Sequence, residues 1–561
     1  MARTVGIGHQ SFEQIIRNNN FYVDKTLFIK EWWENDDAVT LITRPRRFGK
    51  TLNMSMTEQF FSLEYAKRED LFQNLSIWKE EKYRKLQGTY PVISLSFAKL
   101  KETSFLHTRR KICRIIKNLY NHFDFLLASD KLNEDEKATF REISVDMPED
   151  LATDSLNILS DYLARYYGKK IIILLDEYDT PMLEAFINGY WDELVSFVRN
   201  LFNATFKSNP HLERAFMTGI TRISKESVFS DLNNLEVVTT TSEKYKDAFG
   251  FIQEEVYAAL EEYGLSAKAD KVRAWYNGFT FGSRTDIYNP WSITNYLDKK
   301  KFAPYWANTS SNSLINKMIR EGNADIKITM EDLLNGKTLC TKIDEQIVFS
   351  QLNSKRSAIW SLMLASGYLR LKNYTFDEEC GQETYELALT NKEVLLMFKN
   401  MIEDWFAEFT PAYNKFIQAL LAGDKKAMNL YMNKVALTTF SYFDTGKHPS
   451  EANEPERFYH GFVLGLMVDL AGRYSILSNR ESGLGRYDVM LEPKNNEDFA
   501  IILEFKVYDK DEEDSLTDTV AKALEQIERM QYAASLEAKG IRPERIRKYG
   551  VAFEGKQVLI G

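Results

Sequence analysis

The segment from Thr43 to Thr51 has the residue types needed to bind the phosphates of a nucleotide. It reads Thr-Arg-Pro-Arg-Arg-Phe-Gly-Lys-Thr and follows an apolar run from Val39 to Ile42. A Gly-Lys-Thr sequence in this context is informative, because the start of a helix offers unpaired N–H groups to an anion. Gly49 lets the backbone approach the ligand, Lys50 neutralises phosphate charge, and Thr51 is a ligand for Mg²⁺. The pattern predicts a phosphate loop.

One residue of this loop departs from the usual pattern. Arg44 stands where the first glycine is normally found, so the loop is expected to close differently. A solvated basic turn containing Arg44, Arg46 and Arg47 is the alternative interpretation. We predict that the whole segment binds the nucleotide, and its members are Arg44, Pro45, Arg46, Arg47, Phe48, Gly49, Lys50 and Thr51.

Two acids after a second apolar run complete the predicted site. Ile171 to Leu175 reads as a buried strand, and it is followed directly by Asp176 and Glu177. Such acids lie at the carboxyl edge of a parallel sheet, where ligands bind. Asp176 is predicted to hold Mg²⁺ and Glu177 to orient or activate the attacking water. Asp179 has either a secondary polar role or caps the next helix.

A third polar cluster follows another apolar strand and begins at Thr218. Its last member, Arg222, is predicted to stabilise charge on the transferring phosphate, with Thr221 or Arg222 sensing the γ-phosphate. A structural ion pair is an equal alternative for Arg222. The sequence leaves open whether Arg222 acts within its own chain or on a neighbouring copy.

The C-terminal part carries a second set of reactive residues. Asp488 belongs to one predicted strand, and Glu504 and Lys506 belong to the next. Alternation along a strand puts Glu504 and Lys506 on one face and Phe505 on the other. Asp488 and Glu504 are therefore predicted to share a divalent metal, with Lys506 orienting a water molecule, an arrangement suited to phosphodiester hydrolysis. A solvated strand face is the alternative.

The elements that must position these residues change character along the chain. From Ala38 to about Ser230, short apolar strands alternate with helices, which indicates a parallel sheet covered on both faces. The C-terminal segment predicts a helix, three strands, a long helix from Ser515 to Lys539 and closing strands. The predicted division is 1–245 for the P-loop domain, 246–376 for a mostly helical lid-like region, 377–445 for a helical connector and 446–561 for a small α/β domain.

Longer motifs link the chain to a known family. They are Phe21 to Thr26, Arg44 to Thr51, Leu174 to Pro181, Ser224 to Leu235, Tyr288 to Ser292 and the C-terminal segment. In these residues the chain resembles the prokaryotic AAA-ATPase-like family that carries a C-terminal PD-(D/E)xK nuclease-like domain.

The resemblance implies a P-loop NTPase fold and a restriction-endonuclease-like C-terminal fold. It also implies ATP rather than GTP as the nucleotide, and an arginine is usual at the position of Arg44. From the nuclease superfamily it implies that Glu456 is an extra metal-directed acid and that Gln526 is a positioning group.

Composition limits the classes of function. The formal net charge of −9 gives no global basic footprint, so nucleic acid would be bound through local patches. The three cysteines form no CxxC pair, so we expect neither a zinc site nor a set of disulfide bonds. This cysteine usage fits a reducing cytoplasm best. The sequence gives no signal peptide and no apolar run of membrane-spanning length, so we expect a cytoplasmic protein without a membrane anchor.

These observations predict an ATP-binding and ATP-hydrolysing protein coupled to a metal-dependent nuclease. Mg²⁺ is the expected ion, with Mn²⁺ as the alternative at the nuclease site. DNA is the first expected substrate and RNA the second, and a homo-oligomer is left open. The alternative is a nucleotide-dependent signalling or assembly switch in which the nuclease-like domain is a catalytically inactive interaction module.

Overall fold

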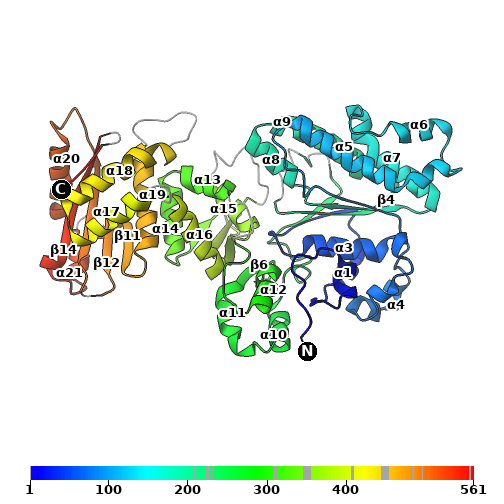
Figure 1. Cartoon of the computed structure of the whole chain (residues 1–561), viewed down its shortest axis with the longest axis horizontal. Helices are drawn as coiled ribbons and strands as arrows, with labels where there is room; N and C mark the ends of the chain where they lie inside the picture. Colours follow the sequence, from blue (N-terminus) through cyan, green and yellow to red (C-terminus); the bar gives the residue numbers. More distant parts are fainter. Residues whose placement is uncertain are drawn as a thin grey trace. The chain divides into compact units, whose positions relative to one another are not determined.

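The computed structural model describes residues 2–207, 209–221, 228–229, 232–307, 313–344, 356–405, 410–443, 454–482, 485–495, 497–554 and 557–561 (Figure 1). The chain divides into two compact units. Unit 1 contains residues 1–310 and 340–394, and unit 2 contains residues 311–339 and 395–561. Each unit is described by itself, and the division of the chain into four parts stays a prediction.

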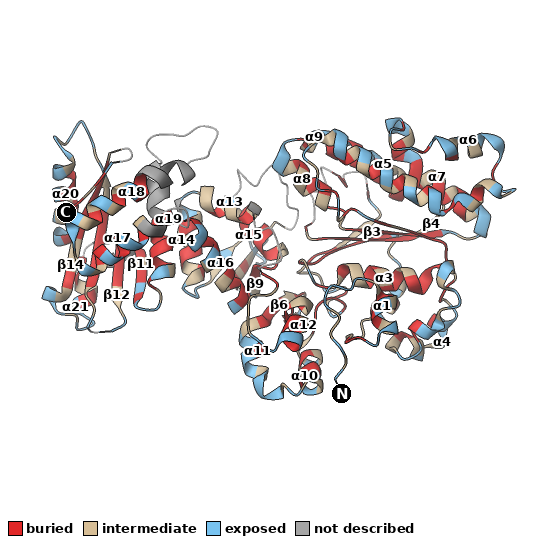
Figure 2. Cartoon of the chain, viewed as in Figure 1, coloured by how far each residue is buried: buried red, intermediate tan, exposed pale blue. Residues whose placement is uncertain are grey.

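Unit 1 is built on a parallel five-stranded sheet in the order β2-β3-β4-β1-β5. Its strands are β1 (Val39–Thr43), β2 (Val92–Ser96), β3 (Ile171–Asp176), β4 (Leu212–Gly219) and β5 (Leu235–Val238). Every residue of β1 and β3 is buried (Figure 2), as expected for strands covered on both faces. The predicted parallel sheet is confirmed.

Helices cover both faces of this sheet. Figure 1 shows α1, α3 and α4 on one side and α5, α7 and α9 on the other. The helices of this region are α1 (Phe12–Arg17), α2 (Leu27–Asn35), α3 (Lys50–Phe61), α4 (Glu81–Arg84), α5 (Phe105–His122), α6 (Glu134–Glu142), α7 (Glu149–Tyr167), α8 (Thr180–Asn188) and α9 (Trp191–Phe202). The layered arrangement places the carboxyl ends of β1, β3 and β4 beside one another at one edge.

The edge strand β5 had no clear signal in the sequence. It is only four residues long, pairs with β1 alone and is half-buried along most of its length. A short, partly exposed edge strand lacks the continuous apolar run that identifies the central strands.

The middle of the chain is mostly helical, as predicted, but it also contains strands. Its elements are α10 (Gln253–Glu262), α11 (Ala269–Tyr276), β6 (Asn277–Phe281), β7 (Arg284–Tyr288), α12 (Pro290–Lys299), β8 (Leu339–Thr341), α15 (Arg356–Ala365), β9 (Leu369–Asp377) and β10 (Gln382–Leu389). Strand β6 contains Gly278, a residue type that is uncommon inside strands. Gly278 has a φ of 126°, and a Cβ there would lie 2.1 Å from the Thr390 carbonyl oxygen, so this glycine serves a close approach of two backbones.

Unit 2 combines helices with a five-stranded mixed sheet in the order β11-β12-β13-β14-β15. The pair β13–β14 is parallel and the other pairs are antiparallel. The strands are β11 (Tyr474–Ser482), β12 (Gly485–Pro493), β13 (Ala500–Val507), β14 (Ile546–Glu554) and β15 (Gln557–Ile560). The helices are α13 (Ser313–Glu321), α14 (Ala324–Leu334), α16 (Lys392–Trp405), which begins in unit 1, α17 (Thr410–Ala422), α18 (Lys425–Phe443), α19 (Glu454–Asp469), α20 (Leu516–Arg529) and α21 (Ala534–Glu537). This α/β domain was predicted.

The long helix predicted from Ser515 to Lys539 is wrong in one respect, because it is interrupted. Helix α20 ends at Arg529, and Gln531 has a φ of 53°, in the left-handed region that a continuing helix does not use. The break lets the buried side chain of Tyr532 turn towards Gln526, to which its hydroxyl is hydrogen-bonded at 3.0 Å. A tertiary contact therefore overrides the local helical pattern.

Among the helices of the described ranges, none combines the length and the apolar character needed to cross a lipid bilayer.

Candidate functional site

The phosphate loop leads from the end of β1 to the first residue of α3. Gly49, with a φ of 82°, immediately precedes the helix, and Lys50 begins it. The Lys50 ammonium is buried and donates hydrogen bonds to the carbonyls of Arg44 and Pro45, both at 2.9 Å. Burial lowers the pKa of Lys50, whereas the carboxylates at 176, 177 and 179 favour its charged form. The loop thus surrounds a lysine at the position that phosphates would approach.

Arg44 has a structural role that its position in the motif did not predict. Its fully buried guanidinium donates hydrogen bonds to the carbonyls of Thr43 and Thr239, at 2.9 and 2.6 Å. It also lies 4.3 Å from the centroid of the Phe281 ring. Burial lowers the pKa of Arg44 to about 9. Because the side chain of Arg44 is held in the protein interior, only its backbone is available to contact a nucleotide.

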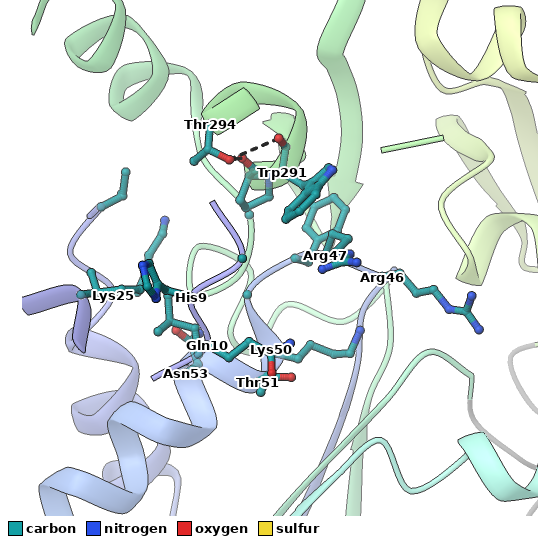
Figure 3. Close-up of a pocket in the computed structure, with 18 of the residues that line it drawn as sticks. His9, Gln10, Lys25, Arg46, Arg47, Lys50, Thr51, Asn53, Trp291 and Thr294 are labelled. Atoms are coloured by element: carbon teal, nitrogen blue, oxygen red, sulfur yellow. Dashed lines mark hydrogen bonds between the residues drawn. The ribbon is translucent and has the colours of Figure 1, made fainter. Parts of the chain in front are cut away.

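The other loop residues divide between the cavity and the core. Arg47 is exposed, has a φ of 66° and stacks its guanidinium 4.3 Å from the centroid of the Trp291 ring. Arg46 is partly exposed, and Figure 3 shows its side chain extending away from Lys50. Phe48 is buried, with its ring centroid 4.8 Å from that of Phe279. Phe48 thus packs in the core and also lines the cavity, whereas Arg44 does not line it.

Asp176 lies beside the start of α3, as the two motifs predicted. The Thr51 hydroxyl donates to Asp176 Oδ2 at 2.7 Å, and the Thr218 hydroxyl donates to Asp176 Oδ1 at 2.5 Å. Burial raises the pKa of Asp176, and both hydroxyls act against that effect. Thr51 and Asp176 present adjacent oxygen atoms, the ligand type that Mg²⁺ prefers. The residues present therefore fit a magnesium ion beside the phosphate loop.

Glu177 follows Asp176 in a backbone conformation that is rare for a residue with a side chain. Its φ is 52°, its N–H donates to Thr218 Oγ1 at 3.1 Å, and Thr180 Oγ1 donates to Glu177 Oε2 at 3.1 Å. Glu177 also lines the cavity next to the phosphate loop. Strained backbone at such a position is typical of a functional site.

Asp179 and the end of β4 form a supporting layer. Asp179 occupies the cap position of α8, but its side chain makes no capping bond. Instead, Asp179 Oδ2 accepts hydrogen bonds from the N–H groups of Ile220 and Thr221, at 2.8 and 2.9 Å. Thr221 therefore positions Asp179. Arg222, the residue predicted to stabilise phosphate charge, lies outside the described residues. The sequence analysis assigned Thr218 no role of its own, although it is the next-to-last residue of β4, at the same edge of the sheet.

A cavity of about 410 Å³ adjoins the phosphate loop (Figure 3). Its volume falls within the range of small-molecule sites, roughly 300–1,000 Å³. Figure 3 shows Lys50 and Thr51 on one side of the cavity and Trp291 and Thr294 on another, with His9 and Lys25 nearby. The sequence did not identify the N-terminal segment or α12 as walls of this site, because their approach to the loop is decided by tertiary packing. Two motifs of the family resemblance, Phe21 to Thr26 and Tyr288 to Ser292, nevertheless contribute residues to its wall. Within the second, Asn289-Pro290 is a typical helix start.

In unit 2, Gln526 of α20 connects the two predicted reactive residues of β13. Lys506 Nζ donates to Gln526 Oε1 at 2.7 Å, and the Gln526 amide donates to Glu504 Oε1. Phe505 instead stacks on Phe553, with ring centroids 6.0 Å apart. The predicted alternation along this strand is confirmed, because Glu504 and Lys506 both contact the same glutamine.

Asp488 lies beside this group on the neighbouring strand. Asp488 Oδ2 accepts a hydrogen bond from the Phe505 N–H at 2.8 Å. Burial raises the pKa of Asp488, and burial together with the charge of Asp488 raises the pKa of Glu504. Glu504 Oε2 is buried and has no hydrogen-bond partner among the residues that the structure describes.

A divalent cation fits this pair of acids, since it would satisfy the unpaired oxygen and offset the charge repulsion. Within the described ranges, no cluster of three or more His, Cys, Asp or Glu residues is arranged to hold a metal. The side chain of Glu456, the third predicted acid, lies outside the described residues.

Comparisons with known proteins agree with this two-part organisation. Residues 6–229 match the family model described as predicted AAA-ATPase, and residues 454–561 match that of the PD-(D/E)XK nuclease superfamily. A relative from Azotobacter chroococcum mcd 1, described as "Uncharacterized protein in vnfD 5'region", is 25% identical over 558 residues. That alignment covers 98% of this chain and 96% of the relative, so the similarity includes both matched regions and the segment between them.

Proposed function

Because the chain joins an AAA-ATPase-like domain to a PD-(D/E)XK nuclease-superfamily domain, we propose that it hydrolyses ATP and that its nucleotide state controls a metal-dependent nuclease. DNA is the proposed substrate, ahead of RNA. The observation that carries the nucleotide half is the hydrogen bond between Thr51 and Asp176, at 2.7 Å, which joins the phosphate loop to the end of β3.

At the nucleotide site, each residue has a separate task. Lys50 would leave the loop carbonyls to contact the β- and γ-phosphates of ATP. Thr51 and Asp176 would hold Mg²⁺, which neutralises phosphate charge when bound. Glu177 would orient the attacking water from the edge of the cavity, and Arg222 is proposed to stabilise charge that develops on the γ-phosphate.

At the nuclease site, Asp488, Glu504 and Glu456 would hold Mg²⁺ or Mn²⁺, which activates water and stabilises phosphate charge when bound. Lys506 would contact the scissile phosphate or the attacking water. Gln526 is proposed to fix the positions of both Glu504 and Lys506, a role that its two hydrogen bonds support.

The test is a cleavage assay on labelled linear, circular and single-stranded DNA, and on RNA, with Mg²⁺ or Mn²⁺ and with or without ATP. We expect Lys506→Ala to abolish cleavage and Lys50→Ala to remove the effect of ATP. Measured beside it, ATP turnover should fall at least about 100-fold in Lys50→Ala and stay near wild type in Lys506→Ala.

The two halves of the proposal can fail separately. Unchanged ATP hydrolysis in Lys50→Ala would remove the nucleotide assignment. Absence of cleavage on every substrate, with ATP still bound or hydrolysed, would instead favour a nucleotide-dependent switch whose nuclease-like domain is an interaction module.

A further inference from the structure

A buried carboxylate lies outside both sites and is used by neither. Glu393, the second residue of α16, is fully buried. Its Oε2 accepts a hydrogen bond from the Ser292 hydroxyl at 2.8 Å, and its Oε1 accepts one from the Trp306 N–H at 2.5 Å. The N–H of Ala307 also points at Oε1, at 3.4 Å. One side chain thus holds α12 and the segment around Trp306 together.

The same two elements hold the backbone of the phosphate loop. The carbonyl of Arg46 accepts hydrogen bonds from the Trp306 indole N–H at 2.9 Å and from the Asn289 amide at 3.3 Å. Asn289 also caps α12 through the Trp291 N–H at 2.9 Å. A continuous set of hydrogen bonds therefore leads from the loop to Glu393.

Contacts between aromatic rings connect the phosphate loop to the same segment around Trp306. The Phe48 ring of the loop contacts Phe279, whose centroid lies 5.4 Å from that of Trp306. Trp306 in turn contacts Tyr368, at 5.6 Å. On the cavity side, Pro290, Trp291 and Thr294 of α12 line the wall beside Lys50 and Thr51. A nucleotide in this cavity would touch both the loop and the helix that Glu393 holds.

Burying the Glu393 carboxylate costs free energy that a purely structural residue would not need to spend. The donors named above are neutral, and burial raises the pKa of Glu393 to about 7 against their effect. Burying a charged carboxylate is unfavourable even when neutral donors satisfy its oxygens, and a glutamine amide could accept from the same N–H groups without the charge. Its place in the chain is informative: residues 392–394 of α16 belong to unit 1, and the helix continues into unit 2 from residue 395.

We propose that Glu393 is a positioning residue that couples nucleotide occupancy of the phosphate loop to the first turn of α16, the helix by which the chain enters unit 2 for the second time. The inference rests on the proposed function, since the occupant is a nucleotide. Binding at the loop fixes the Arg46 carbonyl, which orders Trp306 and α12, and these fix Glu393 and the start of its helix. By reciprocity, an ordered α16 start favours the binding-competent loop.

Hydrogen exchange of the full-length protein, with and without ATP and Mg²⁺, tests this coupling. In wild type, we expect ATP to slow exchange of the amides at 392–398 and 305–307 at least about five-fold. Glu393→Ala and Ser292→Ala should lose most of that difference. Glu393→Gln should retain much of it, because its amide can accept from Trp306 N–H and donate to Ser292 Oγ. Glu403→Ala, an exposed position on the same helix, is the matched control and should behave as wild type.

ATP binding, measured with a fluorescent ATP analogue on the same samples, separates the possible failures. If the wild type and Glu403→Ala bind no ATP, the proposed function and the inference fall together. If they bind ATP but Ser292→Ala and Glu393→Ala keep the full ATP-dependent protection, the coupling alone is overturned. Ser292→Ala keeps the test valid if Glu393→Ala does not fold.

Discussion

At the scale of single residues, the nucleotide site depends on hydroxyl groups that anchor its acids. Thr218 Oγ1 donates to Asp176 and accepts the N–H of Glu177, so it fixes both proposed catalytic positions. An outer residue of this kind sets the orientation of a metal ligand without touching the metal itself.

Thr218→Val removes this hydroxyl and keeps the shape of the side chain. We expect Mg²⁺-dependent ATP turnover to fall about 10- to 100-fold, because Asp176 would lose a donor and its orientation. Thr205→Val is the matched control, since Thr205 is equally buried but donates to the Leu201 carbonyl, away from the site. Equal turnover in the two variants would mean that Thr218 does not support catalysis.

Glu504 gives the metal-free protein a dependence of stability on pH. Because its folded pKa is raised from 4.5 to about 8, the folded carboxyl keeps a proton that the unfolded one has lost within this window. Its contribution to stability is therefore full below pH 4.5 and is lost as the pH rises through the folded value.

The measurement is thermal unfolding of unit 2 in EDTA at several pH values. We expect the wild-type midpoint to fall with rising pH relative to Glu504→Gln, and Mg²⁺ to raise the wild-type midpoint most at high pH. Glu525→Gln, an exposed position on α20, should follow the wild type. Parallel curves for the wild type and Glu504→Gln would refute the raised pKa.

At the scale of elements, the cavity depends on a tight turn that packs against the phosphate loop. Gly250, just before α10, has a φ of 81°, lines the cavity and donates its N–H to the Phe48 carbonyl at 3.4 Å. A Cβ there would lie 2.6 Å from Ile287 Cγ2 and 3.0 Å from the Phe48 ring. The loop, the hairpin β6–β7 and this turn therefore support one another.

Gly250→Ala should destabilise unit 1 by about 2–5 kcal/mol, from the left-handed backbone and the overpacking combined. Gly264→Ala isolates the first cost, because Gly264 has a φ of 67° and open space around its Cβ position. That variant should lose only about 1–2 kcal/mol. Chemical denaturation of both proteins measures the difference, and equal losses would show that the packing around Gly250 adapts.

At the scale of the whole molecule, the two proposed chemistries lie in different compact units. Each has its own acids and its own lysine, so each should respond to mutation separately. We expect Lys50→Ala to leave the stabilisation of unit 2 by Mg²⁺ unchanged, and Glu504→Ala to leave ATP turnover within about two-fold of wild type. Thermal unfolding and ATPase assays on the same preparations check this, and a matching loss in both would argue against two separate sites.

The sequence by itself determined the features that rest on local patterns. The strands β1, β3 and β4 were predicted because each is a short apolar run with polar residues at its end. Alternation along β13 correctly placed Glu504 and Lys506 on one face, because successive side chains of a strand point to opposite sides. The expectation that Asp176 lies at the carboxyl edge of the sheet followed from the rule that parallel strands end at a common edge.

Only the tertiary structure decided the features that depend on contacts between distant segments. The burial of Arg44 beside Phe281, the two bonds made by Thr218, and the interruption between α20 and α21 leave no local signature. The same holds for Glu393, which in the sequence is one acid among many at a helix start. Its partners are set by packing across the fold, and a periodic pattern records which face of an element is buried but not what it is buried against.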